Sequence, residues 1–521
     1  MSKITKQKLF EILNARHLNN PYSKLASIPS PNSFKDIDIA SKRVKEAIEN
    51  KEKITIVGDY DVDGVVSTTI MLEFFNFIGV KVDYIIPNRF EHGYGLSPKI
   101  ADMIDSGLVI TVDNGISAYE ASIILKDKNI DLIITDHHTV GDKLPVALAI
   151  INPKQKDCNF EFKEICGAQV AWYFCAAIKK QMNLNVDMSS FLDLLSLAII
   201  ADIMPMTTLN YTMVKQGLKK MKLSSREAFK LLNQTLAKDI LASDDVGFMI
   251  APKINSAGRM DDASIALEFL LSKSQNSAYE SLALLDELNN YRKALQEEIT
   301  LKAQSQIKNE DRAIVVWGED WHEGVIGIVA SKLSNKYKKP AFIFSIKDNL
   351  AKGSARANSS INLYDLISNA KEILNGFGGH KNAAGLSLDA LKLEEFKDII
   401  NKSLDNFEDN LHDELETLGE LDVQSVDLEF LDIIESFEPY GLENERPIFK
   451  VSDANLIKYE LFGRDKNHLK LILNSDGYLF EAIKFNEKSL DLKESLDLIL
   501  SISKNEFRGV VKPQFLIQEI L

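Results

Sequence analysis

The chain is poor in cysteine and lacks long apolar runs. Only three cysteines, Cys158, Cys166 and Cys175, occur in 521 residues, and their spacing matches no zinc ribbon. So few thiols are typical of a protein from a reducing compartment rather than of a disulfide scaffold. No apolar stretch has the roughly 18 residues that a membrane helix needs, and the first twenty residues are too polar for a signal peptide. We therefore expect a cytoplasmic protein with no membrane segment.

Basic residues are fewer than acidic ones, but the imbalance is local. The net charge is −15, and the window 403–438 alone contains 13 acidic residues and no lysine or arginine. Without it, 61 basic residues face 63 acidic ones, so composition does not exclude a nucleic-acid partner. The acidic window is either an ordinary solvated surface or one that repels DNA. The window 332–381 has nine basic and three acidic residues, which predicts either a phosphate-binding face or a solvated helix surface.

Short apolar segments alternate with helical ones over the first third of the chain. The predicted strands are KITIV, VDYIIP, LVITV, DLIIT and ALAII, which begin at residues 53, 82, 108, 131 and 147. One intervening helix has Ser97 as its cap and Pro98 at its first position. Continuous apolar strands separated by helices predict an α/β fold with a doubly wound parallel sheet that is covered on both faces.

The remaining sequence changes character twice. Residues 167–310 are expected to be almost wholly helical, with a long connector helix over 277–307, and a second α/β unit follows. After the acidic window, short strands and the hairpin signal NSDGY predict a small β-barrel of the oligonucleotide-binding type. The predicted divisions are an N-terminal helical segment, a catalytic domain, a helical region with the connector, a substrate-binding domain, and an acidic linker with the barrel: 1–50, 51–205, 206–310, 311–402 and 403–521.

Polar residues follow the predicted strands at their carboxyl ends, where ligands bind in such sheets. Alternate aspartates in extended backbone would point to one side, so we expect the three after the first strand to converge. An apolar helix further on also ends in an aspartate. The residues concerned are Asp59, Asp61, Asp63, Asp113, Asp136, His137, His138 and Asp202.

So many carboxylates together repel one another unless cations join them. Each motif alone is weak, because an Asp-x-Asp pair is usually a solvated loop and a DNG is usually a turn. Their occurrence at successive strand ends favours a metal site. Oxygen ligands with one or two imidazoles suit two divalent ions, Mn²⁺ before Mg²⁺, rather than a structural zinc. Two such ions can activate water and hold a phosphoryl group.

Several longer motifs have the order and setting found in one known group of enzymes. GDYDVDG, DNG, TDHH and LAIIADIMP resemble the DHH phosphoesterase superfamily. Within it, IPNRFEHGYGLS, INSAGRM, HEGVIGIVASKL, KGSARA, GFGGHKNAAG and PYGLENERPIF resemble the bacterial single-strand-specific exonucleases. The resemblance runs from about residue 30 to the C-terminus. It implies a DHH domain and a smaller DHH-associated domain, joined by a long helix, plus an OB-like barrel.

The resemblance also assigns roles in the metal site. The metal ligands of the superfamily fall on Asp61, Asp63, Asp113, His137 and Asp202. Asp59 lies beside them, as a ligand or as a group that holds one. Relatives such as the family-II pyrophosphatases have a histidine where this chain has Val57, so the ligand set of that metal stays open. Asp136 is expected to orient an imidazole. His138 would face the substrate phosphate as a proton donor or an electrostatic stabiliser.

A second set of residues is expected to hold the substrate. Gly378 and Gly379 offer bare backbone beside His380, within the basic window. Ser354 and Arg356 pair a hydroxyl with a guanidinium that can hold phosphate. By resemblance Arg89, Ser354 and Arg356 surround the 5′ end of a strand, and Arg259 is a further guanidinium within a motif. For His322, before a predicted helix, an anion-binding role and a structural role stay open.

The resemblance implies a 5′-to-3′ exonuclease that degrades single-stranded DNA to 5′-mononucleotides by two-metal hydrolysis. Expected partners are single-strand-binding protein and the helicases of recombination and repair, and the protein is expected to be a monomer. One alternative is a related phosphodiesterase that cleaves short RNA or cyclic dinucleotides, although such enzymes are typically shorter and lack the barrel. Another is a catalytically inactive DNA-binding scaffold, which should have lost several of the carboxylates.

Overall fold

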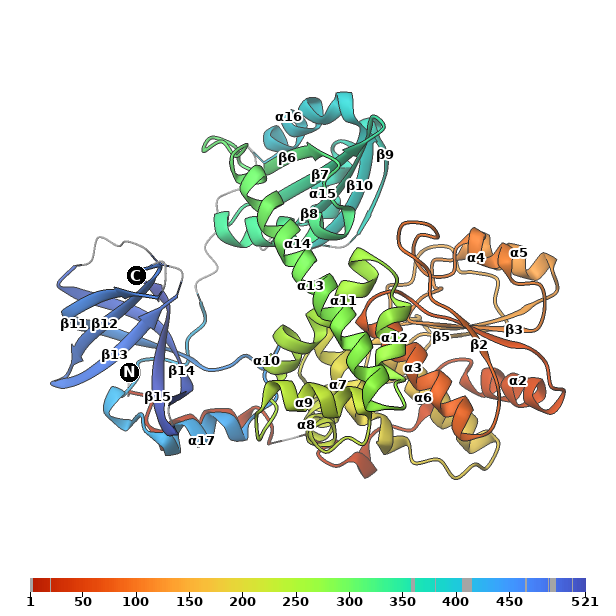
Figure 1. The fold of residues 1–521 in the computed structure, drawn as a ribbon, viewed down its shortest axis with the longest axis horizontal. Helices are drawn as coiled ribbons and strands as arrows, with labels where there is room; N and C mark the ends of the chain where they lie inside the picture. The colour runs from red at the N-terminus through yellow and green to blue at the C-terminus, as the bar shows by residue number, and fades with distance from the viewer. Residues whose placement is uncertain are drawn as a thin grey trace. The chain divides into compact units, whose positions relative to one another are not determined.

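A computed structural model describes residues 3–18, 20–357, 361–379, 381–404, 415–463, 466–485, 487, 493–507 and 509–521. The chain divides into two compact units, and Figure 1 labels their helices and strands. The first comprises residues 1–251, 270–275 and 415–521, and the second comprises residues 252–269 and 276–414. Within the described part of the chain, no helix is both long and apolar enough to span a bilayer.

The first unit contains a five-stranded sheet in the order β2-β1-β3-β4-β5, in which every neighbouring pair is parallel. Its central strands are buried, as expected for a sheet with helices on both faces. The predicted doubly wound parallel sheet is therefore confirmed, and its strands end at one common edge. The strands are β1 (Ile54–Val57), β2 (Asp83–Ile85), β3 (Leu108–Val112), β4 (Asp131–Thr135) and β5 (Ala149–Ile151).

Two helices that pack against this sheet, α3 and α6, and a third that packs against them, α7, are apolar around most of their circumference, which marks interior helices. As predicted, the Ser97 side chain caps α4 and Pro98 is its first residue. The helices of this part are α2 (Ile37–Glu49), α3 (Val62–Phe77), α4 (Pro98–Met103), α5 (Tyr119–Asp127), α6 (Gly167–Gln181), α7 (Leu192–Ala201), α8 (Thr208–Lys222), α9 (Glu227–Leu236) and α10 (Ser243–Asp245), with a π-helical turn at Val246–Ile250 and short 3₁₀ turns at Leu25–Ser27, Pro31–Ser33 and Met188–Phe191.

The same unit contains a closed five-stranded barrel, which confirms the predicted OB-like domain. Asp476 and Gly477 join β12 to β13 with positive φ angles of 52° and 82°, the geometry of the predicted tight hairpin. The N-terminal helix α1 contributes Leu9 and Leu13 to the barrel's core cluster. The elements are α1 (Lys6–Ala15), α17 (Leu428–Ser436), β11 (Ile448–Phe462), β12 (His468–Ser475), β13 (Tyr478–Lys484), β14 (Ser495–Phe507) and β15 (Val510–Ile520), with a 3₁₀ turn at Val423–Ser425.

The second unit contains a mixed sheet in the order β6-β7-β8-β10-β9, in which only β6 and β7 are parallel. The predicted long helix is confirmed as α13, which has 30 residues. The elements in or bordering this unit are α11 (Ala251–Met260), α12 (Ser264–Leu270), α13 (Gln275–Gln304), β6 (Ile314–Glu319), α14 (Glu323–Tyr337), β7 (Ala341–Lys347), β8 (Leu350–Arg356), α15 (Leu363–Ser368), β9 (Leu374–Gly379), β10 (Ala383–Asp389) and α16 (Leu393–Ser403), with 3₁₀ turns at Lys371–Ile373 and Ala390–Lys392.

Candidate metal centre

The first group of acidic residues lies where β1 leads into α3. Asp61 is the N-cap of α3, and its Oδ1 accepts a hydrogen bond from the Gly64 N–H at 3.1 Å. The helix begins at Val62, so Asp63 lies in its first turn. The expectation that all three aspartates alternate along extended backbone is therefore wrong, because the capping interaction of Asp61 starts a helix before Asp63.

Asp63 is held by the N-terminus of α6. Its two carboxylate oxygens accept hydrogen bonds from the Gly167 N–H at 2.6 Å and the Ala168 N–H at 2.9 Å. A Cβ at Gly167 would lie 2.3 Å from Asp113 Oδ1, so only glycine lets α6 approach both carboxylates. Free N–H groups at a helix N-terminus stabilise a negative charge. The sequence reasoning missed these two residues.

Asp113 follows β3 in a left-handed conformation, with φ 62°. Beside it, the buried Asn114 side chain donates to the carbonyl oxygens of Val57 and Gly58, both at 3.0 Å, and to that of Val112 at 2.9 Å. These bonds join the ends of β1 and β3. The motif DNG thus supplies a carboxylate and an amide that fixes the position of that carboxylate, and the amide was not predicted.

The end of β4 provides Asp136, His137 and His138. Asp136 Oδ1 lies 2.8 Å from His138 Nδ1, and its Oδ2 accepts from the Ile116 N–H at 2.8 Å. Burial alone would raise the pKa of Asp136, but the hydrogen bonds from His138 and from backbone N–H groups lower it. Burial alone would lower the pKa of His138, but Asp136 outweighs it and raises that pKa to about 9. Both shifts favour the charged forms, a carboxylate beside an imidazolium.

His137 faces the carboxylates instead. Its Nε2 atom lies 3.2 Å from Asp113 Oδ1, 3.7 Å from Asp63 Oδ2 and 3.6 Å from Asp202 Oδ2. Asp202 is the C-cap of α7. Among the described residues, three groups have donor atoms close enough together to hold a metal ion: Asp59, Asp61 and Asp113; Asp63, His137 and Asp202; and Asp113, His137 and His138.

Buried oxygens within these groups lack hydrogen-bond partners among the described residues. They are Asp59 Oδ1, Asp113 Oδ1 and Asp202 Oδ2. Burial, followed by repulsion from neighbouring carboxylates, raises the pKa of all three side chains. Unsatisfied oxygens that repel one another fit divalent cations, and an oxygen-rich donor set with imidazole suits Mn²⁺ or Mg²⁺. Beside the centre, the Arg89 guanidinium lies over the Tyr60 ring at 4.3 Å.

The second unit brings other predicted residues together at the N-terminus of α14. Arg356 Nη1 donates to Ser354 Oγ at 3.1 Å, and a Cβ at Gly327 would lie 3.0 Å from that oxygen. Arg259 Nη1 is 3.4 Å from the Gly324 carbonyl oxygen, one turn earlier in α14. Two guanidiniums and a hydroxyl thus border the first turns of α14, a setting that favours an anion.

The predicted glycines lie on β9, the edge strand of that sheet. Gly378 and Ser354 are both register partners of Gly385 on the intervening strand β10, and added Cβ atoms at Gly378 and Gly385 would meet no atom of the described residues within 4 Å. Backbone is thus exposed beside Ser354. Gly379 has φ 149° and could not carry a Cβ without meeting Ala383. His380 lies outside the described residues.

His322 has a structural role. It is the N-cap of α14, and its Nδ1 accepts a hydrogen bond from the Gly324 N–H at 3.1 Å. This bond satisfies one of the free N–H groups at the start of the helix. The structural interpretation, one of the two left open by the sequence, therefore has direct support.

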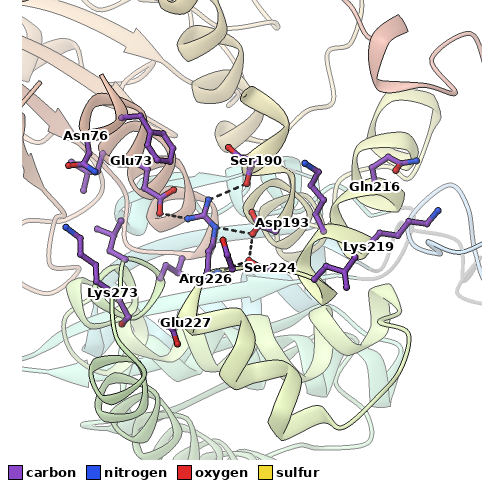
Figure 2. Close-up of a pocket in the computed structure, with 18 residues that line it drawn as sticks. Glu73, Asn76, Ser190, Asp193, Gln216, Lys219, Ser224, Arg226, Glu227 and Lys273 are labelled. Atoms are coloured by element: carbon purple, nitrogen blue, oxygen red, sulfur yellow. Dashed lines mark hydrogen bonds and ion pairs between the residues drawn. The ribbon is translucent and has the colours of Figure 1, made fainter. Parts of the chain in front are cut away.

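A separate pocket of about 940 Å³ lies in the first unit, lined by residues of α3, α7, α8 and α9 (Figure 2). Among its lining residues the Arg226 guanidinium bridges Glu73 on α3 and Asp193 on α7, with a 3.1 Å distance from Nε to Asp193 Oδ2. The metal-centre residues lie at the opposite ends of these two helices, so the pocket is distinct from the metal centre.

Models of three protein families match successive parts of the chain. The DHH family N-terminal domain matches residues 53–199, the DHHA1 domain matches residues 310–406, and the RecJ OB domain matches residues 419–519. The chain is 33% identical over 98% of its length to the single-stranded-DNA-specific exonuclease RecJ of Haemophilus influenzae, and covers 96% of that protein. The chain belongs to the RecJ family.

Other RecJ proteins are similar to this chain over most of its length. The Escherichia coli enzyme is 30% identical, with 93% of this chain and 90% of that protein covered. The Bacillus subtilis RecJ is 33% identical over 96% of this chain, which spans 65% of it. The crystal structure of RecJ from Thermus thermophilus with Mn²⁺ superposes with a TM-score of 0.86, at 27% identity, and covers 99% of this chain and 76% of that one.

Proposed function

We propose that this chain is a metal-dependent exonuclease that degrades single-stranded DNA from its 5′ end to 5′-mononucleotides, in recombination and repair. One observation carries the proposal: buried and half-buried aspartates converge with a histidine in a RecJ-family chain, and several of their oxygens have no other partner among the described residues. The direction of degradation and the nature of the product come from the resemblance to the family.

Within this proposal Asp61, Asp63, Asp113, His137 and Asp202 hold two divalent ions, Mn²⁺ before Mg²⁺. Asp59 shares one candidate group with Asp61 and Asp113, so it is a further ligand or holds one in place. When bound, such ions supply a nucleophilic water at neutral pH and neutralise the phosphate charge. The carboxylates would set the positions of the bound ions, because the interior helices α3, α6 and α7 hold these side chains in place.

His138 is the proposed proton donor and stabiliser of the phosphate. Asp136 orients its ring and favours its protonated form, because the hydrogen bond and the charge of Asp136 both raise the His138 pKa. A positive imidazole next to the metal ligand His137 can donate a hydrogen bond to a phosphate oxygen or to the leaving oxygen. This geometry supports separate roles, in which His137 binds metal and His138 contacts the substrate phosphate.

Arg259, Ser354 and Arg356 are the proposed phosphate-binding residues of the second unit, with exposed backbone at Gly385 beside Ser354 and at Gly378 one strand further. Gly379 and His380 belong to the same proposed surface by resemblance. In the first unit, Arg89 is the proposed contact for the strand's 5′ end, and its stacking on Tyr60 orients the guanidinium. Backbone charge and backbone contacts would give a grip without base preference.

Two alternatives are less well supported. A phosphodiesterase for short RNA or cyclic dinucleotides would not need the C-terminal barrel, and this chain has a RecJ OB domain. An inactive scaffold would not need a complete set of buried carboxylates. The proposal further includes a cytoplasmic monomer that works with single-strand-binding protein and repair helicases, as the family resemblance implies.

The test is a time course on single-stranded DNA labelled separately at its 5′ and 3′ ends, with Mn²⁺ and with chelator. Immediate release of the 5′ label as a mononucleotide, abolished by chelation, is expected. If dinucleotides or short RNA were cleaved while DNA stayed intact, the proposed metal site would be supported and single-stranded DNA would be rejected as the substrate. Binding without cleavage under every metal would favour the scaffold.

A further inference from the structure

A buried pair of amide side chains lies behind the group formed by Asp63, His137 and Asp202. Gln169 is the third residue of α6 and Asn210 the third of α8, with exposed fractions of 0% and 3%. The Gln169 Nε2 atom donates to Asn210 Oδ1 at 2.9 Å. Amides in an apolar interior cost free energy unless their hydrogen bonds are satisfied, so such a pair calls for a physical reason.

The remaining hydrogen bonds of the pair connect segments of backbone. Gln169 Oε1 accepts from the Cys166 N–H at 3.0 Å, at the start of α6. Asn210 Nδ2 donates to the carbonyl oxygens of Glu164 at 2.9 Å and Pro205 at 2.8 Å. The Gln169 amide nitrogen also lies 3.2 Å from the sulfur of Met213. Since the donors and acceptors of both amides are used, their orientations are fixed.

Of the two segments joined in this way, one holds a candidate metal ligand directly and the other follows a candidate ligand along the chain. The start of α6 donates two backbone hydrogen bonds to Asp63, at 2.6 and 2.9 Å. Pro205 lies three residues after Asp202, and the next residue, Met206, donates its N–H to the Leu442 carbonyl oxygen at 2.6 Å. The amide pair is thus a side-chain link between the support of Asp63 and the loop that follows Asp202.

We propose that Gln169 and Asn210 are positioning residues that set the separation of Asp63 and Asp202, and with it the affinity for the cation held between them and His137. The inference rests on the proposed metal centre. None of the pair's hydrogen bonds given above reaches the β1–α3 turn that carries Asp59 and Asp61. The start of α6 also approaches Asp113, a member of the other group, so removing the pair should weaken the Asp63–His137–Asp202 site far more than the Asp59–Asp61–Asp113 site.

The experiment is a Mn²⁺ titration of metal-stripped protein without DNA, followed by calorimetry and by the paramagnetic resonance of free Mn²⁺. In Asn210→Leu, one class of site should lose about 10- to 100-fold in affinity, as removal of groups that support metal ligands typically does. The other class should stay within about twofold. Asn289→Leu is the matched control, because Asn289 is a buried amide that accepts hydrogen bonds from Arg292 within α13, and both classes should keep their affinity.

Gln169→Met provides a second, milder variant, in which an unbranched apolar side chain of similar length replaces the amide. Three results would overturn the proposal. Folded variants could keep wild-type affinity at both classes of Mn²⁺ site, or lose affinity equally at both. Alternatively, both variants could unfold, which would show that the pair stabilises the fold rather than positions the ligands. A wild-type protein that binds no Mn²⁺ would instead overturn the proposed metal centre itself.

Discussion

Substitution of Gly167 by alanine tests the contact between α6 and the carboxylates. The added Cβ would lie 2.3 Å from Asp113 Oδ1 and 2.5 Å from Asp113 Cβ, whereas ordinary contacts begin at 3.4 Å. Either Asp113 or the start of α6, which holds Asp63, must therefore move by about 1 Å, a misplacement that can cost about 100-fold in rate. This corresponds to about 2.7 kcal/mol of transition-state stabilisation.

The assay is single-turnover cleavage of 5′-labelled single-stranded DNA at saturating Mn²⁺, with thermal unfolding measured in parallel. Gly247→Ala is the control, because the only described atom near its added Cβ is Ile200 Cγ2, at an ordinary 3.5 Å. The control should cleave at the wild-type rate. A folded Gly167→Ala protein that also cleaves within threefold of the wild-type rate would refute the argument that this close approach sets the positions of the carboxylates.

Three further predictions concern charge. Asp202→Asn removes a repelling carboxylate and a metal ligand, so in chelator the variant should melt at a higher temperature than the wild type, while Mn²⁺ should raise its melting temperature less. A variant in which both quantities rise, or both fall, relative to the wild type would contradict this. Arg356→Ala should weaken binding of single-stranded DNA at least tenfold by filter binding and leave Mn²⁺ affinity unchanged, and lost Mn²⁺ binding would reject the division between the two sites. Arg226→Met leaves Glu73 and Asp193 without their buried partner, so urea titration should show about 3–5 kcal/mol less stability, and a loss below 1 kcal/mol would show that the bridge is dispensable.

The sequence predicted the sheet and much of the candidate centre because both depend on local patterns. Short apolar strands separated by helices require parallel neighbours, and parallel strands end at one edge. That rule predicts that Asp113 and His137, which follow different strands, lie near one another. The His137 Nε2 and Asp113 Oδ1 atoms are 3.2 Å apart, as expected. The turn at Asp476 and Gly477 was predictable for a similar reason, since only certain residues adopt positive φ cheaply.

Features that depend on distant segments could not be predicted. The support of Asp63 comes from Gly167, 104 residues further along the chain, and no local pattern identifies that partner. The N-terminal helix joins the barrel core through Leu9 and Leu13, which local periodicity cannot reveal either. The helical position of Asp63 is different, because an aspartate directly before an apolar helical segment is a recognised N-cap signal that the alternation argument overlooked.

The helix ends around the metal centre explain why its carboxylates need cations rather than further backbone N–H donors. Asp61 and Asp63 lie at the N-terminus of α3, and Asp63 also accepts from the N-terminus of α6, so helix dipoles stabilise these charges. Asp202 lies at the C-terminus of α7, where the dipole is unfavourable. Burial and then the charge of Asp63 raise its pKa further. Backbone dipoles thus stabilise the negative charge on one side of the Asp63–His137–Asp202 group, and a bound cation would add positive charge on the other side to that of the nearby His138 and Lys154.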